Sequence, residues 1–279
     1  MGHRVIKAFL WRQGLLKDAM RRLWLPWLLL ALGLARPIFA EQIKAEGGSE
    51  RVLRIGAAAD LRYALPEAIA AFSQGGNPLR IEATYASSGK IYAELLQGAN
   101  WDLFLAADQE YPQRLVVAGV ARGEVFVYAH GSVILWARKE ADLWKAGQAL
   151  AALRSASLRR LALANPRVAP YGRAAEETLR RAGLFAGVEG KLVFGENVAQ
   201  AFQFAQQGAA DACLISRSLA LAPAAQKEGR FEEFPPGTSP TLEQGGVILK
   251  GCRQWDLAEA FRDFLLSPEG QKLLRSHGL

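Results

Sequence analysis

The sequence changes repeatedly from a strand pattern to a helix pattern through a short turn of small or polar residues. Residues 79–85 alternate and are rich in β-formers, whereas Ile91, Leu95 and Leu96 recur at helical spacing. The turn between them, residues 86–89, reads Ala-Ser-Ser-Gly. A helix start leaves backbone N–H groups unpaired and carries a partial positive charge, so this turn can receive an anion. The alternative is that one serine only caps its own helix.

The same junction occurs three more times along the chain. Residues 52–59 form an apolar run that ends at Asp60, and residues 161–164 lead through 165–172 into a helical pattern. Residues 191–194 lead through 195–197 into another. Alternation of strands and helices predicts an α/β fold with mainly parallel sheet, in which such turns share the carboxyl edge of the strands. Four turns of this kind indicate an anion cleft.

The rest of the chain continues the alternation. A helix is expected over residues 109–118, and the end of the chain is typical of two amphipathic helices separated at Ser267-Pro268. Further strands are expected at residues 101–107, 125–128, 132–138, 212–216 and 246–249.

Residues 1–40 are typical of a secretory signal peptide. Arg21 and Arg22 precede the apolar run 23–35, and Ala40 supplies a small residue at the cleavage point. The apolar run is shorter than the roughly 20 residues that a membrane span needs. Because Met20 would give a more typical leader, we expect it to be the initiator. We expect the mature protein to be periplasmic. Because no cysteine follows the cleavage point directly, we do not expect a lipid anchor.

The positive charge of the sequence lies almost entirely in this leader. The whole chain has a formal net charge of +7, and residues 1–40 hold seven Lys or Arg against one Asp. The mature part is therefore close to +1. It has no cluster of basic residues with interleaved aromatics, which argues against nucleic acid as a partner.

The residues needed for catalysis or metal binding are scarce. His130 and His277 are isolated, so neither a histidine triad nor a metal site is expected, and no cofactor is implied. Cys213 and Cys252 form a disulfide or stay reduced, and the spacing does not decide between them. Ser87 and Lys90 match S-x-x-K, the spacing of serine acyltransferases, but the companion motifs are missing. The chain is therefore expected not to be an enzyme.

In order and spacing, several segments resemble the periplasmic molybdate-binding proteins that feed molybdate ABC importers. They include AAADL, YASSGKIYAELLQGANWDLFLAAD, LALANPRVAPYGRAAEETL and FLLSPEGQKLL. The resemblance implies the type II periplasmic binding protein fold, in which two lobes, each a mainly parallel sheet flanked by helices, enclose a ligand cleft. We expect lobe I at 41–126 plus 246–279 and lobe II at 127–245. With crossovers near residues 124–128 and 243–247, residues 256–279 should return to lobe I.

The same resemblance implies that a tetrahedral oxyanion is held by neutral donors. Ser88 would donate from its hydroxyl and backbone N–H, and Tyr171 and Val198 from their backbones. The tyrosine that some members carry after a later strand is replaced by Ile215. The oxyanion-binding residues expected from the resemblance are Ala59, Asp60, Ser87, Ser88, Tyr171 and Val198.

Asp60 departs from the family, which usually has serine or asparagine there. A carboxylate about 5 Å from a dianion would cost several kcal/mol even at an effective dielectric of about 20. Either Asp60 caps its helix by accepting from the N–H of Arg62 or Tyr63, or a cation such as Lys90 offsets it, or the ligand differs. We expect the cap.

The function expected from the sequence is extracytoplasmic capture of molybdate or tungstate, delivered by a monomeric binding protein to the membrane permease of an ABC importer. Two alternatives stay open. One is a binding protein for another small solute, because of Asp60. The other is a secreted serine acyl-enzyme that uses Ser87 and Lys90.

Overall fold

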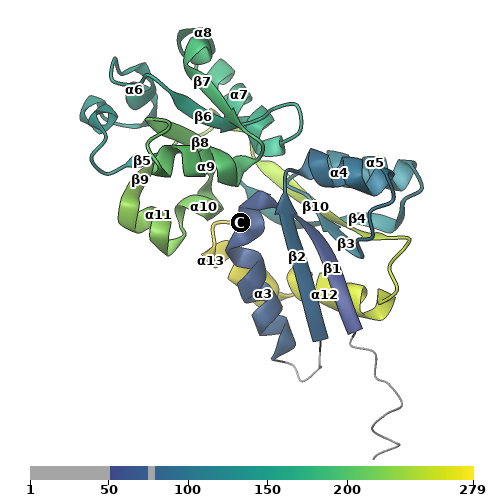
Figure 1. The fold of residues 1–279 in the computed structure, drawn as a ribbon. Coiled ribbons are helices and arrows are strands. Elements are labelled where there is room, and N and C mark those ends of the chain that lie inside the picture. Colours follow the sequence, from purple (N-terminus) through teal and green to yellow (C-terminus); the bar gives the residue numbers. More distant parts are fainter. Residues whose placement is uncertain (1–50, 75–78) are drawn as a thin grey trace, which may run out of the picture. The chain divides into compact units, whose positions relative to one another are not determined.

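The structure is a computed structural model that describes residues 51–74 and 79–279. The expected signal peptide and the Met20 start lie outside these residues. Within them the chain forms two five-stranded mixed sheets with helices against both (Figure 1). This confirms the predicted α/β class. Among the described residues, no helix is both long enough and apolar enough to cross a membrane.

The first sheet has the strand order β2-β1-β3-β10-β4. β1 is parallel to both β2 and β3, while β10 is antiparallel to β3 and β4. The register pairs Ala58 with Ala86, so the carboxyl ends of β1 and β2 lie at the same edge. Its strands are β1 (Arg51–Ala58), β2 (Leu79–Ala86), β3 (Leu103–Leu105), β4 (Ala121–Gly131) and β10 (Leu242–Leu249).

The second sheet has the order β7-β6-β8-β5-β9 and repeats this arrangement. Its inner strand β6 is parallel to β7 and β8, and β5 is antiparallel to β8 and β9. Its strands are β5 (Val133–Arg138), β6 (Leu161–Ala164), β7 (Leu192–Gly195), β8 (Ala212–Ser216) and β9 (Gly229–Glu233). The chain therefore passes from the first sheet to the second at residue 132 and back over residues 234–241.

Helices cover both faces of the first sheet because successive side chains of a strand point to opposite faces. Leu103 and Leu105 belong to a core with Phe261 of α12, whereas Phe104 between them packs with Ile91 of α4 and Leu115 of α5. The first half of the molecule, defined by this sheet, has the helices η1 (Ala59–Arg62), α3 (Ala64–Ser73), α4 (Ser88–Leu96), α5 (Glu110–Val117), α12 (Trp255–Leu266) and α13 (Pro268–Ser276).

The second half, defined by the second sheet, has a core in which Trp136 of β5 meets Phe202 of α9 edge to face at 4.9 Å. Local sequence fixes where its helices begin: Pro170 is the first residue of α7, and Asn197 caps α9. Its helices are η2 (Asp142–Ala146), α6 (Ala149–Arg154), α7 (Pro170–Arg181), α8 (Phe185–Val188), η3 (Glu189–Lys191), α9 (Val198–Gln206), α10 (Arg217–Ala220) and α11 (Pro223–Glu228).

The two C-terminal helices pack against elements of the first half. Phe261 of α12 meets Phe72 of α3 with ring centroids 5.2 Å apart, and Leu274 of α13 is buried in the same core. In Figure 1, α3, α12 and α13 lie together beside the first sheet.

Cys213 and Cys252 are both free thiols, so they do not form the disulfide that the sequence left open. Cys213 is buried in β8, where its Sγ lies 3.7 Å from the carbonyl oxygen of Trp136. Burial raises the pKa of Cys213 well above its ordinary value and that of Cys252 to about 11, so both stay protonated and unreactive at neutral pH.

Candidate functional site

The starts of η1, α4, α7 and α9 meet around one small cavity of about 10 Å³, and nearly all the residues that line it are buried. The helices come from both halves of the molecule, because η1 and α4 follow strands of the first sheet and α7 and α9 follow strands of the second. The predicted residues that line the cavity are Ala59, Asp60, Ser87, Ser88, Tyr171 and Val198, joined by Ala58, Ala86, Ala107, Ala169, Pro170 and Asn197.

Three backbone N–H groups at this cavity are unpaired. The N–H groups of Ser88, Tyr171 and Val198 have no hydrogen-bond acceptor among residues 51–74 and 79–279. In α9 the Asn197 side chain accepts from the next two N–H groups, at 3.0 Å each, which leaves that of Val198 for a ligand. Helix starts carry partial positive charge, so these groups suit an anion.

The two neighbouring serines play different parts. Ser88 Oγ accepts from the backbone N–H of Ala107 at 3.0 Å, so its own proton remains available to donate. Ser87 occupies the N-cap position of α4, yet its hydroxyl makes no capping bond and is buried without a partner. Lys90 Nζ instead contacts Glu196 Oε1 at 2.6 Å, so the S-x-x-K pair needed for an acyl-enzyme does not form.

The prediction that Asp60 caps a helix is wrong. The chain turns directly from β1 into η1, Ala58 is the N-cap residue, and Asp60 is the second residue of the 3-10 helix. Its carboxylate therefore reaches β10, where Oδ2 accepts from Gln244 Nε2 at 2.6 Å, instead of the N–H groups ahead of it. Lys90 does not offset the charge, since it is bound to Glu196.

Burial dominates the electrostatics of Asp60. The side chain is 1% exposed, and desolvation raises its pKa from 3.8 to about 6, against the lowering effect of hydrogen bonds from Gln244 and Tyr171. Burial and the nearby Asp60 raise the pKa values of Tyr171 and Tyr128 well above their ordinary value, so both phenols stay neutral. Asp60 thus titrates close to physiological pH.

Gln244 was not predicted from the sequence. It donates to Asp60 and, at 3.0 Å, to the Tyr171 hydroxyl, and it is fully buried on β10. The crossover expected near residues 243–247 contains Gln244, but the sequence assigns it no role. A single uncharged polar residue inside the run Leu242–Leu249 could have drawn attention to it, because a buried amide needs partners.

Contacts between the halves close the cavity. The Gly89 N–H of α4 donates to the Val168 carbonyl before α7 at 2.8 Å. On one side Lys90 binds Glu196, and on another Arg173 Nη2 contacts Asp108 Oδ2 at 2.5 Å. These contacts hold the halves together around the site.

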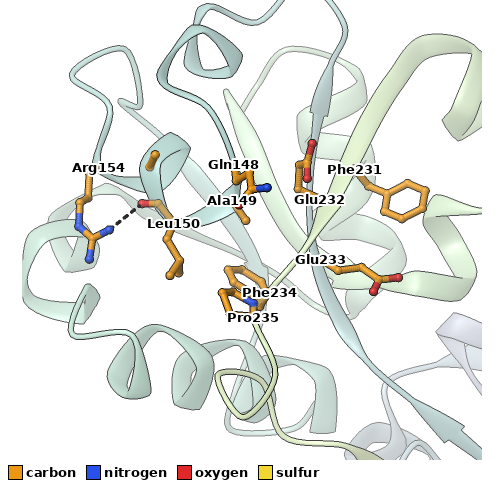
Figure 2. A pocket seen from close by; sticks show the side chains of 10 residues that line it. Gln148, Ala149, Leu150, Arg154, Phe231, Glu232, Glu233, Phe234 and Pro235 are labelled. Atoms are coloured by element: carbon orange, nitrogen blue, oxygen red, sulfur yellow. Dashed lines mark hydrogen bonds between the residues drawn. The ribbon is translucent and has the colours of Figure 1, made fainter.

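A larger hollow of about 770 Å³ lies elsewhere, between α6 and β9, and none of the predicted site residues lines it (Figure 2). Its charged side chains are engaged locally. Arg154 donates to the Leu150 carbonyl, Glu232 contacts Arg230 at 2.7 Å, and Glu233 contacts Arg217 at 2.9 Å. The helix start that borders it is that of α6, whereas four helix starts meet at the central cavity, which we take as the functional site.

The size and donors of the central cavity limit what it can hold. A space of about 10 Å³ is on the scale of one water-sized probe, so in this conformation it excludes organic solutes of metabolite size. Among the described residues, no group of three or more His, Cys, Asp or Glu could hold a metal ion. Neutral N–H and O–H donors around a small space suit a compact oxyanion.

Comparisons with known proteins agree with this geometry. Residues 53–279 match the family described as bacterial extracellular solute-binding protein. The molybdate-binding protein ModA of Rhodobacter capsulatus is 30% identical over 90% of this chain and 93% of its own length, and that of Azotobacter vinelandii is 30% identical over 71% and 78%. The solved Azotobacter vinelandii periplasmic molybdate-binding protein superposes with a TM-score of 0.75 at 26% identity, over 81% of this chain and 97% of the other. The chain belongs to the bacterial extracellular solute-binding proteins.

Proposed function

We propose that this protein captures molybdate, or the similarly shaped tungstate, outside the cytoplasm and delivers it to the membrane permease of an ABC importer. One observation carries the proposal: a small cavity at which the Ser88 hydroxyl and the first free N–H groups of three helices converge. Such donors replace the hydration shell of an anion without a counter-ion. The names of the Rhodobacter and Azotobacter relatives support the choice of anion.

In this proposal five of the six predicted residues have a defined part. The Ser88 hydroxyl and the backbone N–H groups of Ser88, Tyr171 and Val198 donate to the oxyanion. Ala59 and Ser87 complete the wall, and Ser87 can turn its unpartnered hydroxyl toward the ligand. No resident metal or cofactor takes part.

The proposal includes two lobes that close on the ligand by a hinge. Lobe I would comprise 41–126 and 246–279, and lobe II 127–245, with both boundaries inside the paired strands β4 and β10. Sheet membership supports a slightly larger lobe I, reaching Gly131 and starting again at Leu242. The expected signal peptide would direct the protein, as a monomer, to the periplasm.

Thermal unfolding and calorimetry of the mature protein test the ligand. Molybdate or tungstate should raise the melting temperature well above any change caused by sulfate or phosphate, because ligand bound only to the native state stabilises it by mass action. The absence of a shift with every oxyanion at millimolar concentration would overturn the proposal.

A substitution tests the site. Ser88→Ala removes a hydroxyl that bonds a charged ligand, which should weaken molybdate binding by about 1 to 3 kcal/mol. Ser276→Ala is the matched control, since Ser276 is exposed and bonds only the Leu273 carbonyl of its own helix. Equal affinities of the two variants would exclude Ser88 from the site.

A further inference from the structure

The two oxygens of the Asp60 carboxylate have unequal surroundings. Oδ2 accepts a hydrogen bond from Gln244 Nε2, whereas Oδ1 is fully buried and has no partner among the described residues. Ser87 Oγ is in the same situation, and both residues line the central cavity. Buried polar groups are almost always paired, so an unpaired carboxylate oxygen at a ligand site indicates a partner that arrives with the ligand.

No cation faces this carboxylate from the elements around it. β10 contributes the neutral Gln244, α7 the neutral phenol of Tyr171, and β4 the neutral phenol of Tyr128. From α10, Ser218 Oγ donates to the backbone carbonyl of Asp60 at 3.0 Å.

The cations on these elements are engaged elsewhere. Arg173 of α7 is bound to Asp108, Arg217 of α10 is bound to Glu233, and Arg62 of η1 is exposed to solvent. Hydrogen bonds and desolvation, not charges, set the pKa of Asp60. Among residues 51–74 and 79–279 the carboxylate therefore has no cation to neutralise it when an anion enters.

A fully ionised oxyanion has no proton to donate in a hydrogen bond, and neither has an ionised carboxylate. The two would repel in a cavity lined mostly by buried residues. One proton between them changes this contact into a short charge-assisted hydrogen bond. The balance is one carboxylate, one anion and one proton from solvent, which give one complex; no other bond forms or breaks.

We propose that the site binds its oxyanion together with one proton, held between Asp60 Oδ1 and a ligand oxygen. The inference rests on the proposed function and adds to it that capture is coupled to pH. Because the pKa of Asp60 is about 6 before the anion arrives, the proton is taken up on binding at pH 7 and above. Affinity then falls by up to about tenfold for each pH unit above that value.

Calorimetry of the mature protein with sodium molybdate, at pH 7.5 in two buffers of different ionisation enthalpy, measures the protons taken up. We expect close to one proton per anion for the wild type and close to none for Asp60→Asn, whose affinity should not change with pH between 6 and 8. Asp60→Ser, which carries the hydroxyl usual in the family, gives a second neutral variant. Asp142→Asn is the control, because Asp142 is an exposed carboxylate paired with Lys145.

The outcomes separate the two proposals. Binding of molybdate without proton uptake by the wild type, and with affinity constant from pH 6 to 8, overturns the inference and leaves the proposed function standing. Proton uptake that persists in both Asp60 variants also overturns it. Failure of every oxyanion to bind removes the proposed function and the inference with it. If a variant does not fold, the proton uptake measured for the wild type still tests the inference.

Discussion

Because Asp60 is buried, the free energy of unfolding of the protein should depend on pH even when no ligand is bound. The pKa of Asp60 in the native protein is raised to about 6 from 3.8, so between these values the native state binds more protons than the unfolded chain. The contribution of this group to the free energy of unfolding is therefore present at low pH and lost as the pH rises. A shift of this size corresponds to about 3 kcal/mol.

Urea unfolding at pH 4.5 and pH 7.5 measures this contribution. In Asp60→Asn the amide cannot ionise, so the variant should lack this part of the pH dependence and gain stability relative to the wild type at pH 7.5. Parallel pH profiles for the two proteins would mean that Asp60 is not buried in the ligand-free state.

At the scale of residues, the expected set of cavity-lining residues agrees with the structure better than the expected directions of their side chains. All six residues expected from the family resemblance line one cavity, and each lies at a strand-to-helix turn. The direction of the Asp60 carboxylate depends on a 3-10 turn and on Gln244, which is 184 positions away. A local pattern contains no information about such a partner.

At the scale of elements, the start of α4 approaches the second half of the molecule very closely. The Gly89 N–H donates to the Val168 carbonyl at 2.8 Å, and a Cβ on Gly89 would lie 2.6 Å from that oxygen and from the Tyr111 hydroxyl. Neither a backbone carbonyl nor a buried phenol can move away freely, so an added methyl group must push the halves apart.

We therefore expect Gly89→Ala to weaken molybdate binding by about tenfold or more, since roughly 1.4 kcal/mol of lost closure gives that factor. Calorimetry measures it, with thermal unfolding to show that the fold persists. Gly187→Ala is the matched control, because a Cβ at Gly187 in α8 meets nothing within 4 Å. Unchanged affinity in Gly89→Ala would mean that the anion binds without this contact.

Elements with a strong pattern were predicted well, and those with a weak one were missed. The strands β6 and β8 have the predicted bounds, because short apolar runs flanked by turn residues leave little choice. β9 (GRFEE) was missed because it is an edge strand with three charged residues, and it pairs only with β5. Helix α6 was missed as well, since its six residues give too short a window to show helical periodicity.

At the scale of the molecule, alternation along the chain predicted the α/β class. The strand order could not be obtained from periodicity, since β10 pairs with β3 and β4 across more than a hundred residues. Such pairing depends on tertiary packing and not on local preference. The expected crossover positions, residues 124–128 and 243–247, lie within β4 and β10, whereas the chain changes sheets at residue 132 and over residues 234–241.

Two ion pairs, Lys90–Glu196 and Arg173–Asp108, join the two halves across the cleft. Asp108 is 17% exposed in its contact with Arg173, while Lys90 and Glu196 are each 49% exposed, so the Arg173 pair is less screened by solvent. Both pairs join the two halves, so in the proposed hinge motion they would break when the halves open. They should act mainly by slowing release of the anion, since opening must break them.

The double variant Lys90→Gln with Arg173→Gln should therefore bind molybdate about three- to tenfold more weakly, through faster dissociation and with little change in association rate. Stopped-flow kinetics measures both rates. Arg180→Gln is the control, because Arg180 pairs with Glu176 inside the same helix, does not cross the cleft and should leave both rates unchanged. A slower association with unchanged dissociation would show instead that these cations steer the anion into the site and do not hold the halves closed.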